Sequence, residues 1–241
     1  MNNVQKVQNN CKATILWSLL GSRLILFLFF QATLALLFNS WETSQKYWLL
    51  TATLTNIVSI ISLYFLMKRE GSSYRKLFRF SRITFRKDLL IFIGLALLMG
   101  PVAFFPNNYL SIWIWGNVEI PFKMMFQPIE SWLLYALLLA FPVTISLAEL
   151  ATYLGYIMPE LENQLMSKWI AVLLPVLFLS IQHCTLPFIP DAKFILYRGL
   201  VFLPFALMLG VSVKFRPTLF PYFAILHGVM DFGTALMFLT V

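Results

Sequence analysis

A succession of about seven long apolar stretches constrains this chain more than any other feature. The hydrocarbon core of a bilayer offers no water to backbone N–H and C=O groups, so a stretch of about 20 apolar residues crosses it as a helix. Of the 241 residues, 60% are hydrophobic and 12% are charged, whereas roughly 25% are charged in soluble domains. We therefore predict an all-α, polytopic transmembrane helix bundle that forms a single membrane domain over residues 1–241. The predicted spans are approximately 14–38, 47–67, 89–105, 131–157, 169–187, 196–213 and 218–239.

The positive charges indicate how this bundle sits in the lipid bilayer. The formal net charge is +8, and eight of the eighteen basic residues lie in one loop between spans, at 68–88. Lys and Arg concentrate in cytoplasmic loops, so we place this loop, and with it the N-terminus, in the cytoplasm. A basic cluster between two apolar spans is a topology signal, and we expect no nucleic acid partner. The eight residues are Lys68, Arg69, Arg75, Lys76, Arg79, Arg82, Arg86 and Lys87.

The segment 106–130, on the predicted outer side, is unusually rich in aromatic residues. It carries Trp113, Trp115, Phe122 and Phe126, and amphipathic aromatic rings favour the membrane–water interface. The segment is either interfacial or a short extra helix that enters and leaves the membrane. The number of spans, seven or eight, therefore stays open.

Six ionisable side chains fall inside predicted spans, where a charge at mid-bilayer costs about 2.5–3.5 kcal/mol even on a lenient insertion scale. They are Arg23, Glu149, His183, Arg198, His227 and Asp231. Arginine side chains are long enough to keep their stems in lipid and their guanidinium groups in the headgroups. We expect Arg23 and Arg198 to do this.

The remaining four residues, Glu149, His183, His227 and Asp231, are expected to meet in one hydrated pocket. Helix geometry places Glu149 and His227 at similar depth, with His183 about 8 Å further from the cytoplasm. Gathering the four groups around water removes most of the cost of burying them separately. A carboxylate can then activate water, and imidazoles can transfer protons or stabilise an oxyanion.

The last predicted span holds two of these groups four residues apart. His227 and Asp231 therefore share one helix face. Gly228 and Gly233 on the same helix are expected to let a neighbouring helix approach closely.

Three other interpretations of the polar set stay open. The groups could serve only as polar contacts between helices. They could bind zinc, although the chain lacks the short HExxH spacing of many zinc hydrolases. They could also relay protons in a transporter, although the sequence shows no inverted repeat.

Three sequence segments resemble the motifs of the CAAX protease and bacteriocin-processing family. The segment AELATYLGYIMPEL resembles the first motif, EExxxR followed by a glycine and a proline, with Glu149 as its first glutamate. The segment LSIQHCTLPFIPD resembles the second motif, FxxxH, with Leu179 in place of the phenylalanine and His183 as the histidine. The segment ILHGVMDF resembles the third, HxxxN or HxxxD, through His227 and Asp231.

The resemblance implies an intramembrane endopeptidase of the glutamate type that needs no metal or other cofactor. Its substrate would be a membrane-associated or prenylated peptide. Glu149 would activate the attacking water as general base with His183 assisting, and His227 and Asp231 would form the oxyanion-stabilising face. Residues 131–239 would form the catalytic core, while 1–130 would contribute the N-terminal spans and the basic loop 68–88.

Two positions depart from the first motif. Its second glutamate is Leu150 in this chain, and its arginine is Leu154. Losing both together is consistent with removal of an ion pair as a unit, because losing one would leave a buried charge unpaired. The resemblance therefore also accommodates a non-catalytic relative, acting as a membrane immunity, regulatory or binding protein.

Overall fold

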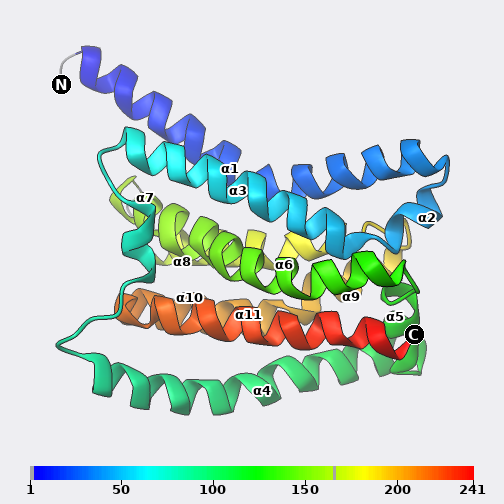
Figure 1. Ribbon diagram of the computed structural model, residues 1–241. Coiled ribbons are helices and arrows are strands. Elements are labelled where there is room, and N and C mark those ends of the chain that lie inside the picture. Colours follow the sequence, from blue (N-terminus) through cyan, green and yellow to red (C-terminus); the bar gives the residue numbers. More distant parts are fainter. Residues whose placement is uncertain (1–2, 165–166) are drawn as a thin grey trace.

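The computed structural model describes residues 3–164 and 167–241, and every regular element in these two ranges is helical (Figure 1). The α-helices are α1 (Asn3–Phe38), α2 (Trp41–Gln45), α3 (Trp48–Arg69), α4 (Phe85–Trp115), α5 (Glu119–Met125), α6 (Ser131–Leu150), α7 (Met158–Gln164), α8 (Lys168–Ile181), α9 (Ala192–Val201), α10 (Leu203–Phe215) and α11 (Phe220–Leu236). Shorter 3₁₀ or π-helical segments extend or connect them: η1 (Tyr74–Phe78), η2 (Ala151–Ile157), η3 (Gln182–Thr185), η4 (Pro217–Leu219) and η5 (Met237–Thr240).

Seven helical segments within the described ranges are long and apolar enough to cross a membrane. They confirm the predicted all-α polytopic bundle, and the protein is an integral, multi-pass membrane protein. The segments are Ala13–Phe38, Trp48–Arg69, Phe85–Trp115, Ser131–Gln164, Lys168–Thr185, Ala192–Phe215 and Pro217–Thr240.

The aromatic segment 106–130 contains the last part of α4 and the short helix α5. Residues 106–115 continue α4, which passes through Pro101 and Pro106 and ends where Gly116 adopts a left-handed backbone conformation, with φ of 72°. Membrane helices tolerate proline where neighbouring helices, hydroxyl side chains or water satisfy the backbone groups that it frees. The next helix, α5, has seven residues and a length of about 10 Å, so it is too short to cross a bilayer.

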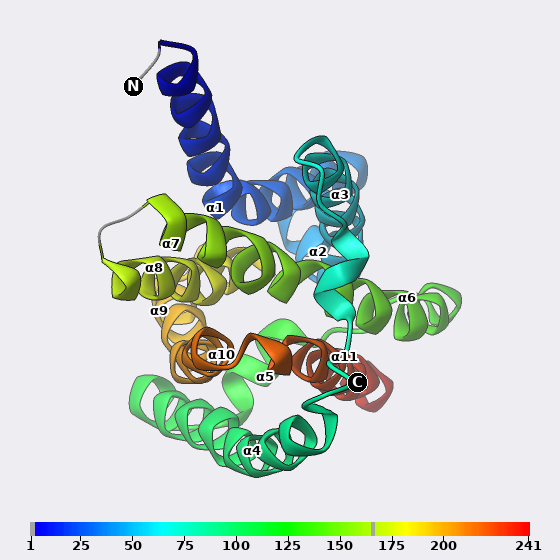
Figure 2. The same ribbon diagram turned by 90° about the vertical axis from the view of Figure 1, so that its left-hand side faces the viewer.

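The spans lie side by side along one direction, with their ends at two opposite faces of the bundle (Figure 1). The loop after α3, the start of α4 and the α10–α11 connection lie at one face (Figure 1). Viewed end-on, α4 lies at the edge of the bundle opposite α1 and α3 (Figure 2). Within α4 only Asp88, Met99 and Ser111 are buried, so most of this helix is available to lipid.

Polar contacts fix α4 near its start and beyond its middle. The buried Asp88 carboxylate accepts hydrogen bonds from Arg216 Nε at 2.5 Å and Thr218 Oγ1 at 3.0 Å, which joins α4 to the α10–α11 connection. Further along, the Tyr197 hydroxyl of α9 donates to Asn107 Oδ1. Between these contacts, α4 is held mainly by apolar side chains.

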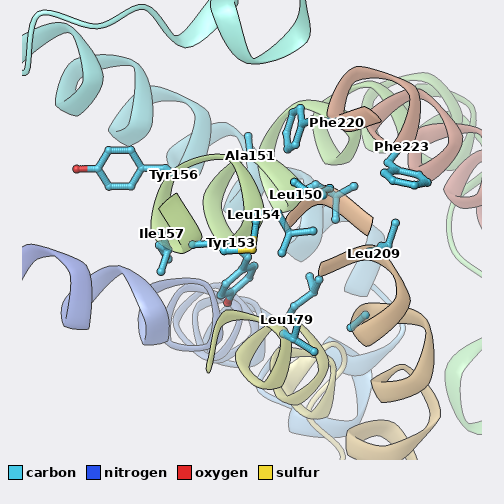
Figure 3. Close-up of a cluster of buried hydrophobic side chains, with 14 of the residues drawn as sticks. Leu150, Ala151, Tyr153, Leu154, Tyr156, Ile157, Leu179, Leu209, Phe220 and Phe223 are labelled. Carbon is cyan, nitrogen blue, oxygen red and sulfur yellow. The ribbon is translucent and has the colours of Figure 1, made fainter. Parts of the chain in front are cut away.

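A large apolar cluster surrounds η2 and contains Leu150, Leu154, Leu179 and Leu209 (Figure 3). Leu150 and Leu154 occupy the positions at which the resembled motif has its second glutamate and its arginine, and both are buried. Apolar packing therefore surrounds both positions in this chain.

Close approach of α6 and α11 depends on one glycine of the predicted pair. A Cβ on Gly228 would lie 2.9 Å from Ser146 Cβ and 3.0 Å from the Pro142 carbonyl oxygen, both on α6. A Cβ on Gly233 would meet nothing within 4 Å. The prediction for close packing is therefore confirmed at Gly228 and wrong at Gly233, which is exposed on α11.

The variants Gly228→Ala and Gly233→Ala are expected to separate this packing from ordinary helix propensity. Gly228→Ala forces a methyl group against the α6 backbone and should lower the free energy of unfolding by about 1–3 kcal/mol. Gly233→Ala on the same helix has open space and should be neutral or stabilising by up to about 1 kcal/mol. Thermal unfolding of both proteins in detergent measures the difference, and equal melting temperatures would contradict the close contact.

Candidate functional site

Glu149 lies near the end of α6, two residues before the π-helical segment η2 begins, and its side chain is 2% exposed. Single π-helical turns inside α-helices occur frequently at functional sites because they change the direction in which side chains point. From the predicted cytoplasmic loop, the Tyr74 hydroxyl donates to the Leu147 carbonyl oxygen, two residues before Glu149. The loop after α3 therefore contacts the backbone that carries Glu149.

The imidazole of His227 on α11 faces two carboxylates. Its Nε2 atom lies 3.1 Å from Glu149 Oε1 and 3.4 Å from Asp231 Oδ2. These are ion-pair distances, yet neither His227 Nε2 nor Asp231 Oδ2 makes a well-aligned hydrogen bond to another described residue. Both buried atoms therefore have hydrogen-bonding capacity left for a third group, such as water or a ligand.

His183 lies in η3, the tight turn that follows α8. Its Nδ1 atom lies 2.9 Å from the Leu179 carbonyl oxygen, which can only accept a hydrogen bond, so Nδ1 carries the proton. The ring stacks on Phe202, with 3.9 Å between ring centroids. These contacts fix the ring and leave Nε2 as the ring nitrogen available for chemistry.

One cavity of about 580 Å³ joins the four predicted residues. Glu149, His183, His227 and Asp231 all line it, and the remaining lining is mostly apolar and comes largely from α4, α5, α6, α9, α10 and α11. His183 was predicted to lie further from the cytoplasm than Glu149 and His227, but it lines the same cavity as they do. The structure thus brings the predicted polar set together inside the bundle, as the sequence analysis expected.

The prediction for Arg23 is wrong, because this side chain does not reach the headgroups. It is 0% exposed, and its guanidinium donates to Gln182 Oε1 at 2.8 Å, Asn56 Oδ1 at 2.9 Å, Ser59 Oγ at 3.2 Å and Glu149 Oε2 at 3.3 Å. Acceptors from three other parts of the bundle satisfy the guanidinium, so burial no longer leaves its charge unpaired. The polar residues Asn56 and Ser59 in the second apolar span are the sequence signal that could have indicated this partner set.

The same prediction is wrong for Arg198, which is also buried. Its guanidinium donates to the carbonyl oxygens of His183 at 3.2 Å and Leu186 at 2.7 Å, and it lies over the Phe202 ring at 4.8 Å from the centroid. Arg198 thus binds the backbone of η3, the turn that carries His183, and it also lines the cavity.

Within residues 3–164 and 167–241, no group of three or more His, Cys, Asp and Glu side chains has the arrangement of a metal site. A scan against protein-family models found no match, and searches of curated proteins and of solved structures found none either.

Proposed function

We propose that this chain is an intramembrane endopeptidase of the glutamate type, related to the CAAX protease and bacteriocin-processing family, that cleaves a membrane-associated or prenylated peptide. One observation carries the proposal: Glu149 Oε1 lies 3.1 Å from His227 Nε2 beside a largely apolar cavity that His183 and Asp231 also line. A carboxylate beside imidazoles in a partly dry site can carry out general acid–base hydrolysis. The three motif-like segments supply these same residues.

The proposed reaction assigns one role to each polar side chain. Glu149 takes a proton from a water molecule, whose oxygen bonds to the scissile carbonyl carbon. The C–N bond breaks as that proton passes to the leaving nitrogen, with His183 Nε2 assisting the transfer. His227 Nε2–H stabilises the developing oxyanion, and Asp231, 3.4 Å from the same nitrogen, completes the oxyanion-stabilising face.

The cavity also supports a lipid-associated substrate. Its volume of about 580 Å³ falls within the range of roughly 300–1,000 Å³ that is usual for ligand sites. Gly100, Ala103 and Phe104 of α4 form part of its wall, and α4 is mostly exposed to lipid. An apolar chain attached to a peptide in the bilayer could therefore contact apolar side chains on the lipid-exposed face of α4 and in the cavity.

The proposed orientation places the loop 68–88 in the cytoplasm. Lys214 and Arg216 lie at the same end of the bundle as this loop, since Arg216 binds Asp88 at the start of α4. Positive charge therefore gathers at one end, as the positive-inside rule requires. An odd number of spans then directs the end of α11 to the opposite side of the membrane.

A second candidate function, a non-catalytic binding or regulatory protein, has one observation in its favour. The Glu149 carboxylate is 2% exposed and its Oε2 is paired with Arg23, so that it also serves as a structural ion pair. Such a protein would keep the cavity and bind a membrane peptide without cleaving it.

Peptide cleavage by the purified protein in liposomes distinguishes the two functions. Wild-type protein is expected to cleave a prenylated or membrane-anchored reporter peptide, with the cut located by mass spectrometry. Glu149→Gln and His183→Ala proteins are expected to bind the same peptide without cleaving it. Equal cleavage by all three would contradict the proposed mechanism, and tight binding without cleavage by wild type would favour the second candidate.

Filling the cavity is expected to weaken substrate binding. Ala103→Trp places an indole into the cavity from α4 and should raise KM by about 10-fold or more, since a bulky group there removes apolar surface from the substrate. Leu97→Trp is the matched control, because Leu97 lies on the same helix, is exposed and does not line the cavity. KM for the reporter peptide is the measurement, and an equal effect of both substitutions would contradict this assignment of the cavity.

A further inference from the structure

We propose that Arg23 is a positioning residue of this site: from α1 it holds the carboxylate of Glu149 and the turn that carries His183 in their working arrangement. The inference rests on the proposed function, because it assigns Arg23 a role in the same reaction. Arg23 does not line the cavity, so it acts through Glu149 rather than on the substrate.

The two oxygens of the Glu149 carboxylate have different partners. Arg23 Nη2 binds Oε2 at 3.3 Å, whereas Oε1 faces His227 Nε2 at 3.1 Å. A carboxylate held at one oxygen by a buried cation cannot rotate freely, so the other oxygen stays directed toward the imidazole. Arg23 therefore selects which oxygen of Glu149 is presented to water as the base.

The guanidinium itself is held in place on several sides. Its acceptors are oriented in turn, since Asn56 Nδ2 donates to Thr144 Oγ1 at 3.2 Å and Ser59 Oγ donates to the Thr55 carbonyl oxygen at 2.8 Å. The Phe27 ring lies near the guanidinium, with its centroid 5.2 Å from Cζ. The planar guanidinium of arginine has several donors in fixed directions and fits this set of fixed acceptors. The compact ammonium group of lysine cannot reach all of them.

A second bond of Arg23 connects the base to its assisting histidine. Arg23 Nε donates to Gln182 Oε1 at 2.8 Å, and Gln182 is the residue before His183 in η3. Gln182 Nε2 in turn donates to the Leu179 carbonyl oxygen at 3.2 Å, and His183 Nδ1 binds the same oxygen. One side chain from α1 thus sets the relative positions of Glu149 on α6 and His183 in η3.

The position of this cation distinguishes the chain from the motif it resembles. The motif has an arginine where this chain has Leu154, which is buried in the apolar cluster around η2. Arg23 supplies a buried cation from the N-terminal half instead. The working site therefore requires α1 and α3 as well as residues 131–239.

Steady-state kinetics of Arg23 variants test this role. Displacement of a catalytic group by about 1 Å lowers rates on the order of 100-fold, so Arg23→Gln should reduce kcat by about that factor with KM nearly unchanged. Arg23→Lys keeps the charge but reaches fewer acceptors, and it should recover part of kcat. Asn56→Leu removes one acceptor of the Arg23 guanidinium and replaces it with a side chain of similar size. It should lower kcat less than Arg23→Gln does. A residue that only stabilises the fold would change the amount of active protein and show no graded recovery with lysine.

Arg216→Gln is the matched control, because Arg216 also pairs with a buried carboxylate but lies away from the cavity. It should lower stability and leave kcat per folded molecule unchanged. Folded protein is quantified by size-exclusion chromatography and thermal unfolding in detergent. Should Arg23→Gln fail to fold, Arg23→Lys and Asn56→Leu decide the question by their kcat.

The outcomes separate this inference from the proposed function. A wild-type protein that cleaves no reporter peptide, or a Glu149→Gln protein as active as wild type, overturns the proposed function and the positioning role with it. Wild-type cleavage that is lost in Glu149→Gln but retained at full kcat in folded Arg23→Gln, or in both Arg23→Lys and Asn56→Leu, overturns the positioning role alone.

Discussion

Glu149→Gln is expected to lower kcat for a membrane-anchored peptide by about 100- to 10,000-fold, the range that general-base catalysis contributes. Glutamine keeps the shape of the side chain and one oxygen that can accept from Arg23, but it cannot take a proton from water. In the proposed function the apolar cavity wall binds the peptide, so KM should change far less than kcat. Initial rates over a range of peptide concentrations in liposomes measure both parameters.

A control must separate lost chemistry from lost folding, because Glu149 is also half of a buried ion pair. The double variant Arg23→Gln/Glu149→Gln contains no unpaired charge at this position and should remain folded yet inactive. Glu119→Gln on α5 removes an exposed carboxylate that pairs with Lys123 on the surface, and it should cleave at the wild-type rate. Activity in the double variant would contradict the role of Glu149 as the base.

The helical spans could be predicted closely because the bilayer leaves the backbone few alternatives. Every apolar stretch of sufficient length became a helix, and the seven predicted ranges match the seven observed segments to within several residues at most ends. The largest error lay in α4, whose predicted span ended at residue 105, whereas the helix continues to Trp115. The two prolines inside α4 each remove one backbone hydrogen bond from the helix. In lipid this costs less than unfolding the segment, which would leave all of its backbone groups without partners, so the helix continues through both prolines.

The polar residues of the site could be predicted because each charge within a span requires a partner. Glu149, His183, His227 and Asp231 were singled out on this ground, and they do line one cavity. The spacing of four residues between His227 and Asp231 predicted their proximity, which the distance of 3.4 Å bears out. Their catalytic roles remain predictions.

The partners of the two arginines could not be predicted in the same way. Position along a span suggested that Arg23 and Arg198 reach the headgroups, since depth is the only property that a single span reveals. Which helix faces α1 is decided by packing across the bundle, where Arg23 meets Gln182, 159 residues away in the chain. Contacts of this kind depend on the order of helices around the bundle, which apolar periodicity does not encode.

The ion pair between Arg23 and Glu149 is expected to couple the stabilities of α1 and α6 strongly. Arg23→Met and Glu149→Leu each leave one buried charge without its partner, and each should lower the free energy of unfolding by about 3–5 kcal/mol. The double variant leaves neither charge, so its loss should be smaller than the sum of the two single losses by about 2 kcal/mol or more. Unfolding in detergent, followed by tryptophan fluorescence, gives the three free energies.

This comparison of the two single variants with the double variant is a double-mutant cycle. It does not depend on whether the protein is an enzyme, so it tests the buried network directly. The double variant should not regain full wild-type stability, because Asn56, Ser59 and Gln182 lose the donor that satisfies their oxygens. A control cycle of Lys214→Met with Glu149→Leu should be additive within about 0.5 kcal/mol, since Lys214 pairs with Glu162 instead. Additivity of the Arg23 and Glu149 substitutions would mean that the two side chains do not pair inside the bundle, and the positioning role of Arg23 would lose its physical basis.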